Sequence, residues 1–186
     1  DGGEMKEIVL ATALSLLATT VDAADFRLSS SDVEQNKQMV DLHLQNGSGC
    51  SGGDQSPSLS WSGAPEGAKS FAVTMYDPDA PTGSGWWHWS VLNIPTSVHK
   101  LDRNAGQRDG GKLPAGAVQG RTDFAVPGYG GACPPAGDKT HHYHFKVWAL
   151  SVEKLEINRE MSAAQIGYMV RSNSLASAEL VPVATR

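Results

Sequence analysis

Apolar and polar residues alternate through much of this chain with the two-residue period of β-strands. We expect strands in five such segments, residues 26–29, 39–44, 71–76, 89–94 and 176–183. In the second segment His43 is expected to be a surface residue. Residues 96–120 are polar and rich in glycine without a clear period, so we expect most of this long stretch to be irregular.

A sixth strand, residues 143–150, has two distinct faces. One face carries Tyr143, Phe145, Val147 and Ala149, and the other carries His144, Lys146 and Trp148. The first set is apolar and predicts a side that packs in the core. His144, on the other side, should face solvent.

One helix is expected, over residues 163–172. Ser162 and Gln165 have the spacing of a capping box, and apolar residues follow at helical intervals. Strands do not alternate with crossover helices elsewhere in the chain. The pattern therefore predicts a mainly β fold, an antiparallel β-sandwich with one or two short helices.

The N-terminus has the pattern of a secretory signal peptide. An apolar run over residues 8–18 follows Lys6, and small residues lead to an expected cut after Ala23. This run is too short for a permanent membrane span, and a buried N-terminal helix is the alternative. We expect residues 1–23 to be upstream sequence and signal peptide, and residues 24–186 to be a single domain in the periplasm.

Charge and cysteine content narrow the class of protein. Removal of residues 1–23 changes the formal net charge from −5 to −2, and no basic run is present, which argues against nucleic-acid binding. The two cysteines, Cys50 and Cys133, lie in glycine-rich loops. Because an exported chain enters an oxidising compartment, we expect them to form a disulfide rather than to stay free thiols. Their spacing matches no zinc motif.

Two dense loops hold the candidate chemistry. The first contains Asp77, Asp79 and His88 between two expected strands, and the second contains Gly130, Gly131, Pro134, Pro135, His141 and Tyr143. Glycine-rich backbone, two imidazoles and a phenol can all donate hydrogen bonds to phosphate oxygens. In this interpretation the Asp77 carboxylate orients a histidine or accepts a hydrogen bond from the ligand.

Two enzymatic alternatives use the same residues. A metal site would combine His88 and His141 with Asp77 or Asp79, although the spacing matches no recognised metal motif. A hydrolase would use Ser84 or Ser90 as nucleophile with His88 as base and Asp77 as orienting group. Ser84, between Gly83 and Gly85, lacks the residues around a nucleophile elbow.

The tryptophans and prolines have simpler interpretations. Trp61, Trp86, Trp87, Trp89 and Trp148 are expected mainly to pack, and one of them could form a wall of the pocket. Pro78 and Pro81 restrict the first loop, and the sequence does not decide whether either follows a cis bond.

The motifs at residues 76–81, 87–89 and 134–143 resemble the signatures of the phosphatidylethanolamine-binding protein family. Its bacterial Raf-kinase-inhibitor-like YbhB/YbcL branch is the most similar part. The signal pattern and the cysteine pair resemble the exported YbcL members of that branch. The resemblance extends from Phe26 to Val183.

The resemblance implies a sandwich of two antiparallel sheets with a small anion pocket, and binding without turnover or cofactor. By position, Asp77, His88, His141 and Tyr143 correspond to the pocket residues of the family, and Gly131 and Pro135 to its pocket loop. Expected partners are a small phosphate-like anion and a protein partner in signalling. Whether the chain is a monomer or a homodimer stays open.

Overall fold

The computed structural model describes residues 25–186, so the expected signal peptide and its cut after Ala23 lie outside the described residues. The longer elements are β5 (Ser70–Asp77), β6 (Trp86–Ile94), β10 (His144–Leu150), α1 (Ala163–Ser172) and β11 (Ser174–Leu180). The shorter elements are β1 (Arg27–Ser29), η1 (Asp41–His43), β2 (Asn46–Gly47), β3 (Cys50–Ser51), β4 (Leu59–Ser62), β7 (Lys100–Leu101), β8 (Val118–Gln119), β9 (His141–His142) and β12 (Val183–Ala184). None of the helices in this part of the chain is long and apolar enough to cross a bilayer.

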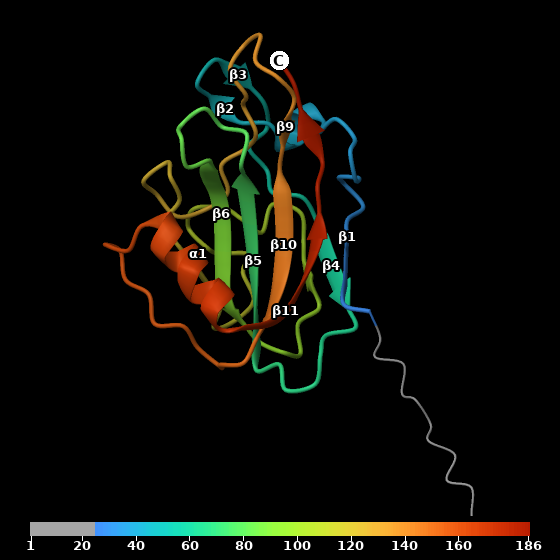
Figure 1. The fold of residues 1–186 in the computed structure, drawn as a ribbon, viewed down its shortest axis with the longest axis vertical. Helices are drawn as coiled ribbons and strands as arrows, with labels where there is room; N and C mark the ends of the chain where they lie inside the picture. Colours follow the sequence, from blue (N-terminus) through green and yellow to red (C-terminus); the bar gives the residue numbers. More distant parts are fainter. Residues whose placement is uncertain (1–24) are drawn as a thin grey trace, which may run out of the picture.

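Two antiparallel sheets form the body of the fold. The larger sheet has the order β11-β10-β5-β6-β8, and the smaller has the order β1-β4-β7. Figure 1 shows the long strands side by side, with β1 and β4 beside them and α1 lying across one face of the larger sheet. The prediction of a mainly β, antiparallel sandwich with a short helix is confirmed.

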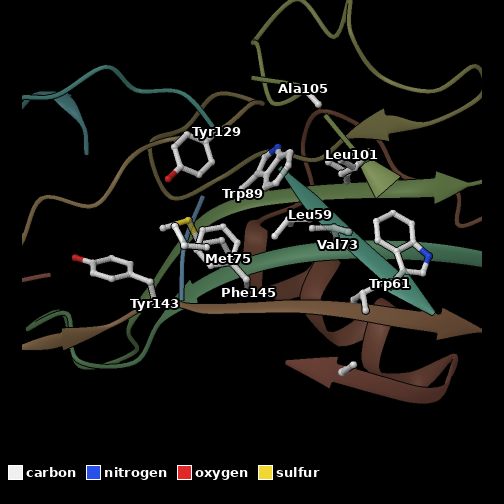
Figure 2. Close-up of a cluster of buried hydrophobic side chains, with 14 of the residues drawn as sticks. Leu59, Trp61, Val73, Met75, Trp89, Leu101, Ala105, Tyr129, Tyr143 and Phe145 are labelled. Atoms are coloured by element: carbon white, nitrogen blue, oxygen red, sulfur yellow. The ribbon is translucent and has the colours of Figure 1, made fainter. Parts of the chain in front are cut away.

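The main core lies between the two sheets. The inward residues of β5 are Phe71, Val73 and Met75, and the smaller sheet contributes Leu59 and Trp61 from β4. Trp89 of β6 is fully buried in this cluster, where Figure 2 shows it beside Tyr129. Each large side chain buried in this way stabilises the fold by roughly 1.5–3 kcal/mol, so the apolar face of each strand fixes which side points inward.

Helix α1 covers part of the outer face of the larger sheet. Its buried residues Ile166 and Val170 pack against Leu92, Trp148 and Leu150. The expected capping box is present, because the Ser162 side chain accepts from the Gln165 backbone and the Gln165 side chain accepts from the Ser162 backbone. The predicted bounds of this helix are confirmed.

Segment 39–44 is not the strand that the alternation predicted. It forms the short 3₁₀ helix η1, and its ends bond to different segments, Met39 N to Val183 O and Gln45 N to Ala132 O. No continuous ladder forms because these partners lie apart. His43 is buried rather than on the surface, and its Nδ1 lies 2.7 Å from Gln55 O.

Three further boundaries differ from the prediction. Strand β6 begins at Trp86 rather than at Trp89, so His88 lies in a strand and not in the expected loop. The C-terminal strand is divided into β11 and β12, which fits a proline at position 182, since proline has no backbone N–H for a ladder. Within residues 96–120 the two short strands β7 and β8 add edges to the two sheets, and the rest is irregular as expected.

Candidate functional site

A cavity of about 270 Å³ opens where β5 ends, β6 begins and β9 passes. The expected residues Asp77, His88, Pro135, His141 and Tyr143 all line it. The remaining lining residues are Gln45, Ser48, Ala80, Pro81, Thr82, Trp86, Phe124 and Cys133. The fold therefore brings the two dense loops together into one site.

A β-bulge directs His88 into this cavity. Met75 pairs with Trp89, but the next residue of β5, Tyr76, pairs with Trp87, so His88 is an extra residue in β6. A bulge of this kind changes the side on which the following side chains point. His88 consequently shares the inner side with Trp89, while Trp87 turns to the outer face beside Tyr76.

His88 is held as a neutral ring. It is buried, and its Nδ1 donates to Gly130 O at 2.8 Å. Its ring also meets Phe124 and Tyr143 edge to face, with centroids 5.4 and 5.3 Å away. Burial lowers the pKa of His88 and outweighs the hydrogen bond to Gly130, so the ring is neutral and leaves Nε2 as an acceptor.

His141 is held in the opposite state. Its Nδ1 lies 2.7 Å from Asp77 Oδ2, and its Nε2 lies 3.2 Å from Asp138 Oδ2. Burial acts to lower the pKa of His141, but the two carboxylates outweigh it and raise the pKa. Both ring nitrogens must donate to satisfy both carboxylates, so this geometry is that of an imidazolium.

The Asp77 carboxylate also shapes the first loop. Its Oδ1 accepts from Asp79 N at 2.8 Å, which closes a turn over Pro78. The side chain of Asp77 is buried against His141. One carboxylate therefore fixes the loop backbone and the protonation state of His141 together. The described chain contains no cis peptide bond, so Pro78 and Pro81 both follow trans bonds.

Two of the expected ligand-binding residues, Asp79 and Gly131, do not line the cavity. Asp79 Oδ1 accepts from Lys139 Nζ at 2.6 Å, and its Oδ2 accepts from His142 N at 2.9 Å. Burial acts to raise the pKa of Asp79, but the hydrogen bonds to Lys139 and His142 prevail and hold it well below its usual range. Asp79 thus joins the first loop to β9 from outside the cavity.

Gly131 has a packing role in the cavity wall. A Cβ there would lie 2.4 Å from the Gln45 backbone nitrogen, so only glycine fits. Its N–H donates to Asp54 Oδ1 at 2.7 Å. This close approach presses the second loop against residues 43–45 and places Cys133 and Pro135 at the cavity.

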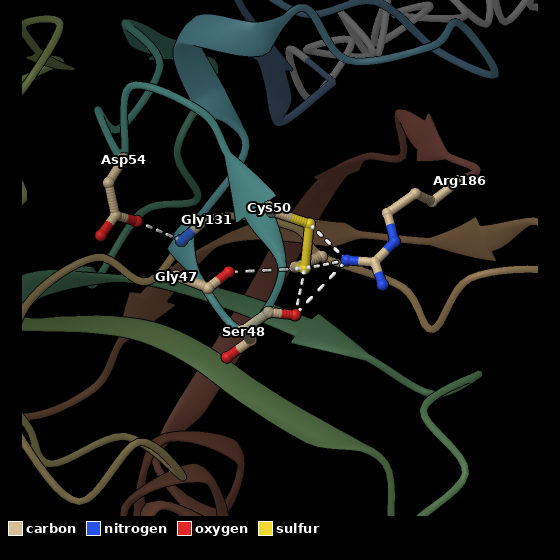
Figure 3. The surroundings of a disulfide bond; sticks show 7 residues. Gly47, Ser48, Cys50, Asp54, Gly131 and Arg186 are labelled. Atoms are coloured by element: carbon tan, nitrogen blue, oxygen red, sulfur yellow. Dashed lines mark hydrogen bonds between the residues drawn. A yellow bond between two sulfur atoms is a disulfide. The ribbon is translucent and has the colours of Figure 1, made fainter.

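The expected disulfide between Cys50 and Cys133 is present, with a Cα–Cα distance of 6.0 Å (Figure 3). Arg186 Nη1 lies 3.2 Å from Cys50 Sγ, and it donates to Ser48 O at 3.4 Å. Cys133 Sγ lies 3.6 Å from Ser48 O, a contact and not a hydrogen bond, because an oxidised sulfur carries no proton. The disulfide fixes the β2–β3 hairpin against one wall of the cavity.

Sequence analysis listed Trp86 only as one of five tryptophans that could form a wall of the pocket, and it did not identify Phe124, Gln45 or Ser48. Trp86 lines the cavity, and its Nε1 is buried without a hydrogen-bond partner in residues 25–186. Its place two residues before His88 was the available signal. Phe124, Gln45 and Ser48 come from irregular segments far away in the chain, where no pattern pointed to them.

The two enzymatic alternatives find no support in the geometry. Within residues 25–186, no group of three His, Cys, Asp or Glu side chains is arranged to hold a metal ion. Ser84 is exposed in the turn before β6 and does not line the cavity. Ser90 is buried near Ile166, on the side of the sheet opposite to His88.

Comparison with known proteins decides which family carries this site. Residues 29–184 match the family described as phosphatidylethanolamine-binding protein. The chain belongs to the phosphatidylethanolamine-binding protein family. YbcL of Escherichia coli K12 is 55% identical over 179 residues, which cover 96% of this chain and 98% of YbcL. YbhB of the same organism is 45% identical over 154 residues, which cover 83% of this chain and 96% of YbhB.

Solved structures of the phosphatidylethanolamine-binding protein family agree with this assignment. The crystal structure of E. coli YbcL matches with a TM-score of 0.86 at 58% identity, covering 88% of this chain and 99% of that one. The homologue CT736 from Chlamydia trachomatis matches with a TM-score of 0.71 at 28% identity, with coverage of 88% and 99%. The resemblance to the YbhB/YbcL branch is confirmed.

Proposed function

We propose that this member of the phosphatidylethanolamine-binding protein family is an exported, non-enzymatic protein that binds a small phosphate-like anion. The observation that carries the proposal is the buried His88, whose Nδ1 is occupied by Gly130 O while the ring lines a cavity. The cavity, about 270 Å³, lies just below the usual range of roughly 300–1,000 Å³ for ligand pockets. This size suits an ion or a phosphorylated headgroup better than acyl chains.

Binding of the anion is coupled to a proton at His88. A neutral His88 accepts at Nε2 from a protonated phosphate oxygen, whereas a protonated His88 donates from Nε2 to a phosphate anion. Either route places one shared proton between the ring and the ligand. Because burial disfavours the charged ring in the empty site, an anion beside it should raise the pKa of His88.

The other walls position the ligand. Trp86 brings an indole N–H that has no hydrogen-bond partner among the described residues. His141 cannot be a second ring donor while Asp77 and Asp138 hold both of its nitrogens. Its charge is offset by these two carboxylates, so it shapes the wall of the cavity and does not attract the anion. The Asp138 carboxylate does not line the cavity but contacts His141 beside it, and it is partly exposed, so it can accept from the ammonium group of a zwitterionic headgroup.

The proposals of export and of a binding role are supported by separate observations. The disulfide between Cys50 and Cys133 suits an oxidising compartment such as the periplasm. The separation of Ser84 and Ser90 from His88 supports binding rather than hydrolysis. Modulation of signalling through a protein partner is a proposal that draws on the family alone.

Calorimetric titration with inorganic phosphate and with O-phosphorylethanolamine tests the proposal. His88→Gln should weaken both ligands at least tenfold, because a charge-assisted hydrogen bond contributes about 1.5–3 kcal/mol. His142→Gln is the matched control, since that imidazole is half exposed and does not line the cavity, and it should change affinity less than twofold. Unchanged affinity in His88→Gln would refute the assignment.

The same titrations separate the two sources of phosphate. The proton at His88 is tested in the same titrations. At a pH above the pKa of free His88, binding of either ligand should take up a proton, which shows as a dependence of the binding enthalpy on the ionisation enthalpy of the buffer. Asp138→Asn should weaken O-phosphorylethanolamine and leave inorganic phosphate unchanged if the headgroup ammonium is recognised. Equal effects on both ligands would assign the site to free phosphate.

A further inference from the structure

The outer face of the larger sheet carries a second groove, of about 200 Å³, on the side opposite to the anion cavity. Its floor is Thr74 of β5, and aromatic rings stand at both ends. Tyr76 and Trp87 form one end, with ring centroids 4.6 Å apart, and Trp148 forms the other. The bulge at His88 makes this groove, because it turns Trp87 outward beside Tyr76.

The aromatic ends are held in place by their neighbours. Trp148 Nε1 donates to Thr74 Oγ1 at 2.9 Å, so that indole cannot rotate freely. Helix α1 approaches Trp87 so closely that a Cβ at Gly167 would lie 2.6 Å from the indole ring. Arg171 follows Gly167 by four residues, on the same side of α1, and lines the groove. The groove is therefore built between the sheet and the helix.

The rim of the groove is basic. His144 and Lys146 line it from β10 and share a single acid, Glu179, at 2.5 and 3.2 Å. Arg171 has no carboxylate partner among the described residues. Lys146 and Arg171 thus face a single acidic group, Glu179, and a negatively charged ligand is the complement of this surface.

The geometry points to this groove as a binding site for an acidic sugar residue, a six-membered ring that carries a carboxylate. The size of the groove suits one such ring. The half-buried rings of Tyr76 and Trp87 offer apolar surface for the face of the sugar, whereas Trp148 is buried and closes the far end of the groove. Arg171 is exposed and can hold a carboxylate with two parallel hydrogen bonds. Lys146 Nζ lies over the Trp148 ring, 5.6 Å from its centroid, which places a second cation in the groove.

Nuclear magnetic resonance tests this site, with the Trp148 Nε1–H signal as reporter. The full chain in phosphate-free buffer is titrated with D-glucuronate, with D-glucose as the neutral match and benzoate as a flat carboxylate without a sugar ring. Glucuronate should give a saturable shift with an affinity at least tenfold higher than that of glucose or benzoate. No saturable shift, or an equal response to glucose or benzoate, would overturn the proposal.

Surface variants make the test specific. Arg171→Gln should weaken glucuronate binding at least fivefold, because it removes the guanidinium that holds the carboxylate. Arg171 is exposed, so the substitution should leave the core intact. Lys154→Gln is the matched control, since this exposed lysine lies outside the groove and should have no effect. His88→Gln should leave glucuronate binding unchanged, which separates this site from the anion cavity. A loss in Lys154→Gln equal to that in Arg171→Gln would show a general charge effect and overturn the site.

Discussion

His88 and His141 line the same cavity and are both buried, yet their surroundings give them opposite charge states. Gly130 in the second loop offers His88 a backbone carbonyl, and burial lowers the pKa of His88. Asp77 and Asp138 offer His141 two carboxylates, and these raise the pKa of His141 against the effect of burial. The hydrogen-bond partner, more than burial, decides which histidine can exchange a proton with a ligand.

The largest effect on stability should follow from removing the buried pair of Asp77 and His141. Asp77→Ala leaves a buried imidazolium with only Asp138 and removes the acceptor for Asp79 N. Removal of one partner from a buried ion pair costs about 3–5 kcal/mol, so we expect the free energy of unfolding to fall by about 3 kcal/mol. Urea unfolding with the disulfide intact measures it. A loss below about 1 kcal/mol would contradict the buried pair.

Double substitution sharpens this result. In Asp77→Asn with His141→Gln, no buried charge remains without its partner, and the partly exposed Asp138 stays solvated, so part of the stability lost in Asp77→Asn alone should return. Additive losses from the two positions would show that they do not interact.

A smaller effect, recognised by its sign, should appear in the pH dependence of unfolding. An unfolded histidine titrates near pH 6.5. The lowered pKa of His88 means that the unfolded state binds more protons, so this residue reduces stability as pH falls below about 6.5. The raised pKa of His141 contributes stability that is fully present below about pH 6.5 and is lost as pH rises through its folded value.

Single variants separate these two contributions. His88→Gln should remove part of the loss on the acid side, and His141→Gln should remove part of the loss on the alkaline side. Urea unfolding at a series of pH values measures both. The reverse assignment of the two slopes would contradict the comparison.

The smallest effect on stability is expected for the surface ion pair of Lys139 and Asp79. Lys139 is mostly exposed, so solvent screens its ion pair with Asp79 and the pair adds little to stability. Lys139→Gln should therefore change stability only slightly and phosphate affinity less than twofold. A tenfold loss of phosphate affinity would show that Asp79 and Lys139 belong to the binding site, against their position outside the cavity.

Much of the fold follows from local pattern. The capping box at Ser162 and Gln165 gave helix α1, and the alternating faces of residues 143–150 gave β10 and its core side. These signals are local, because capping and burial act within one element. His43 shows the limit, since its burial depends on Gln55 and Tyr129, and no period in its own segment records them.

The sequence predicted four residues that line one cavity, but not how they are arranged there. Asp77, His88, His141 and Tyr143 were identified, and all four line the cavity. The bulge at His88 depends on how β6 pairs with β5, so the sequence of β6 alone could not show that His88 and Trp87 point to opposite faces. The position of Asp79 depends likewise on Lys139 and His142, which belong to another loop.

One measurement tests the central claim most directly, the titration of the imidazole signals of His88 and His141 by nuclear magnetic resonance. Spectra of His88→Gln and His141→Gln assign the two signals, and the titration is run with and without inorganic phosphate. The account predicts that His88 titrates below 6.5 in the free protein and moves upward with phosphate, while His141 titrates above 6.5 in both. A His88 that titrates above His141, or that does not respond to phosphate, would contradict it.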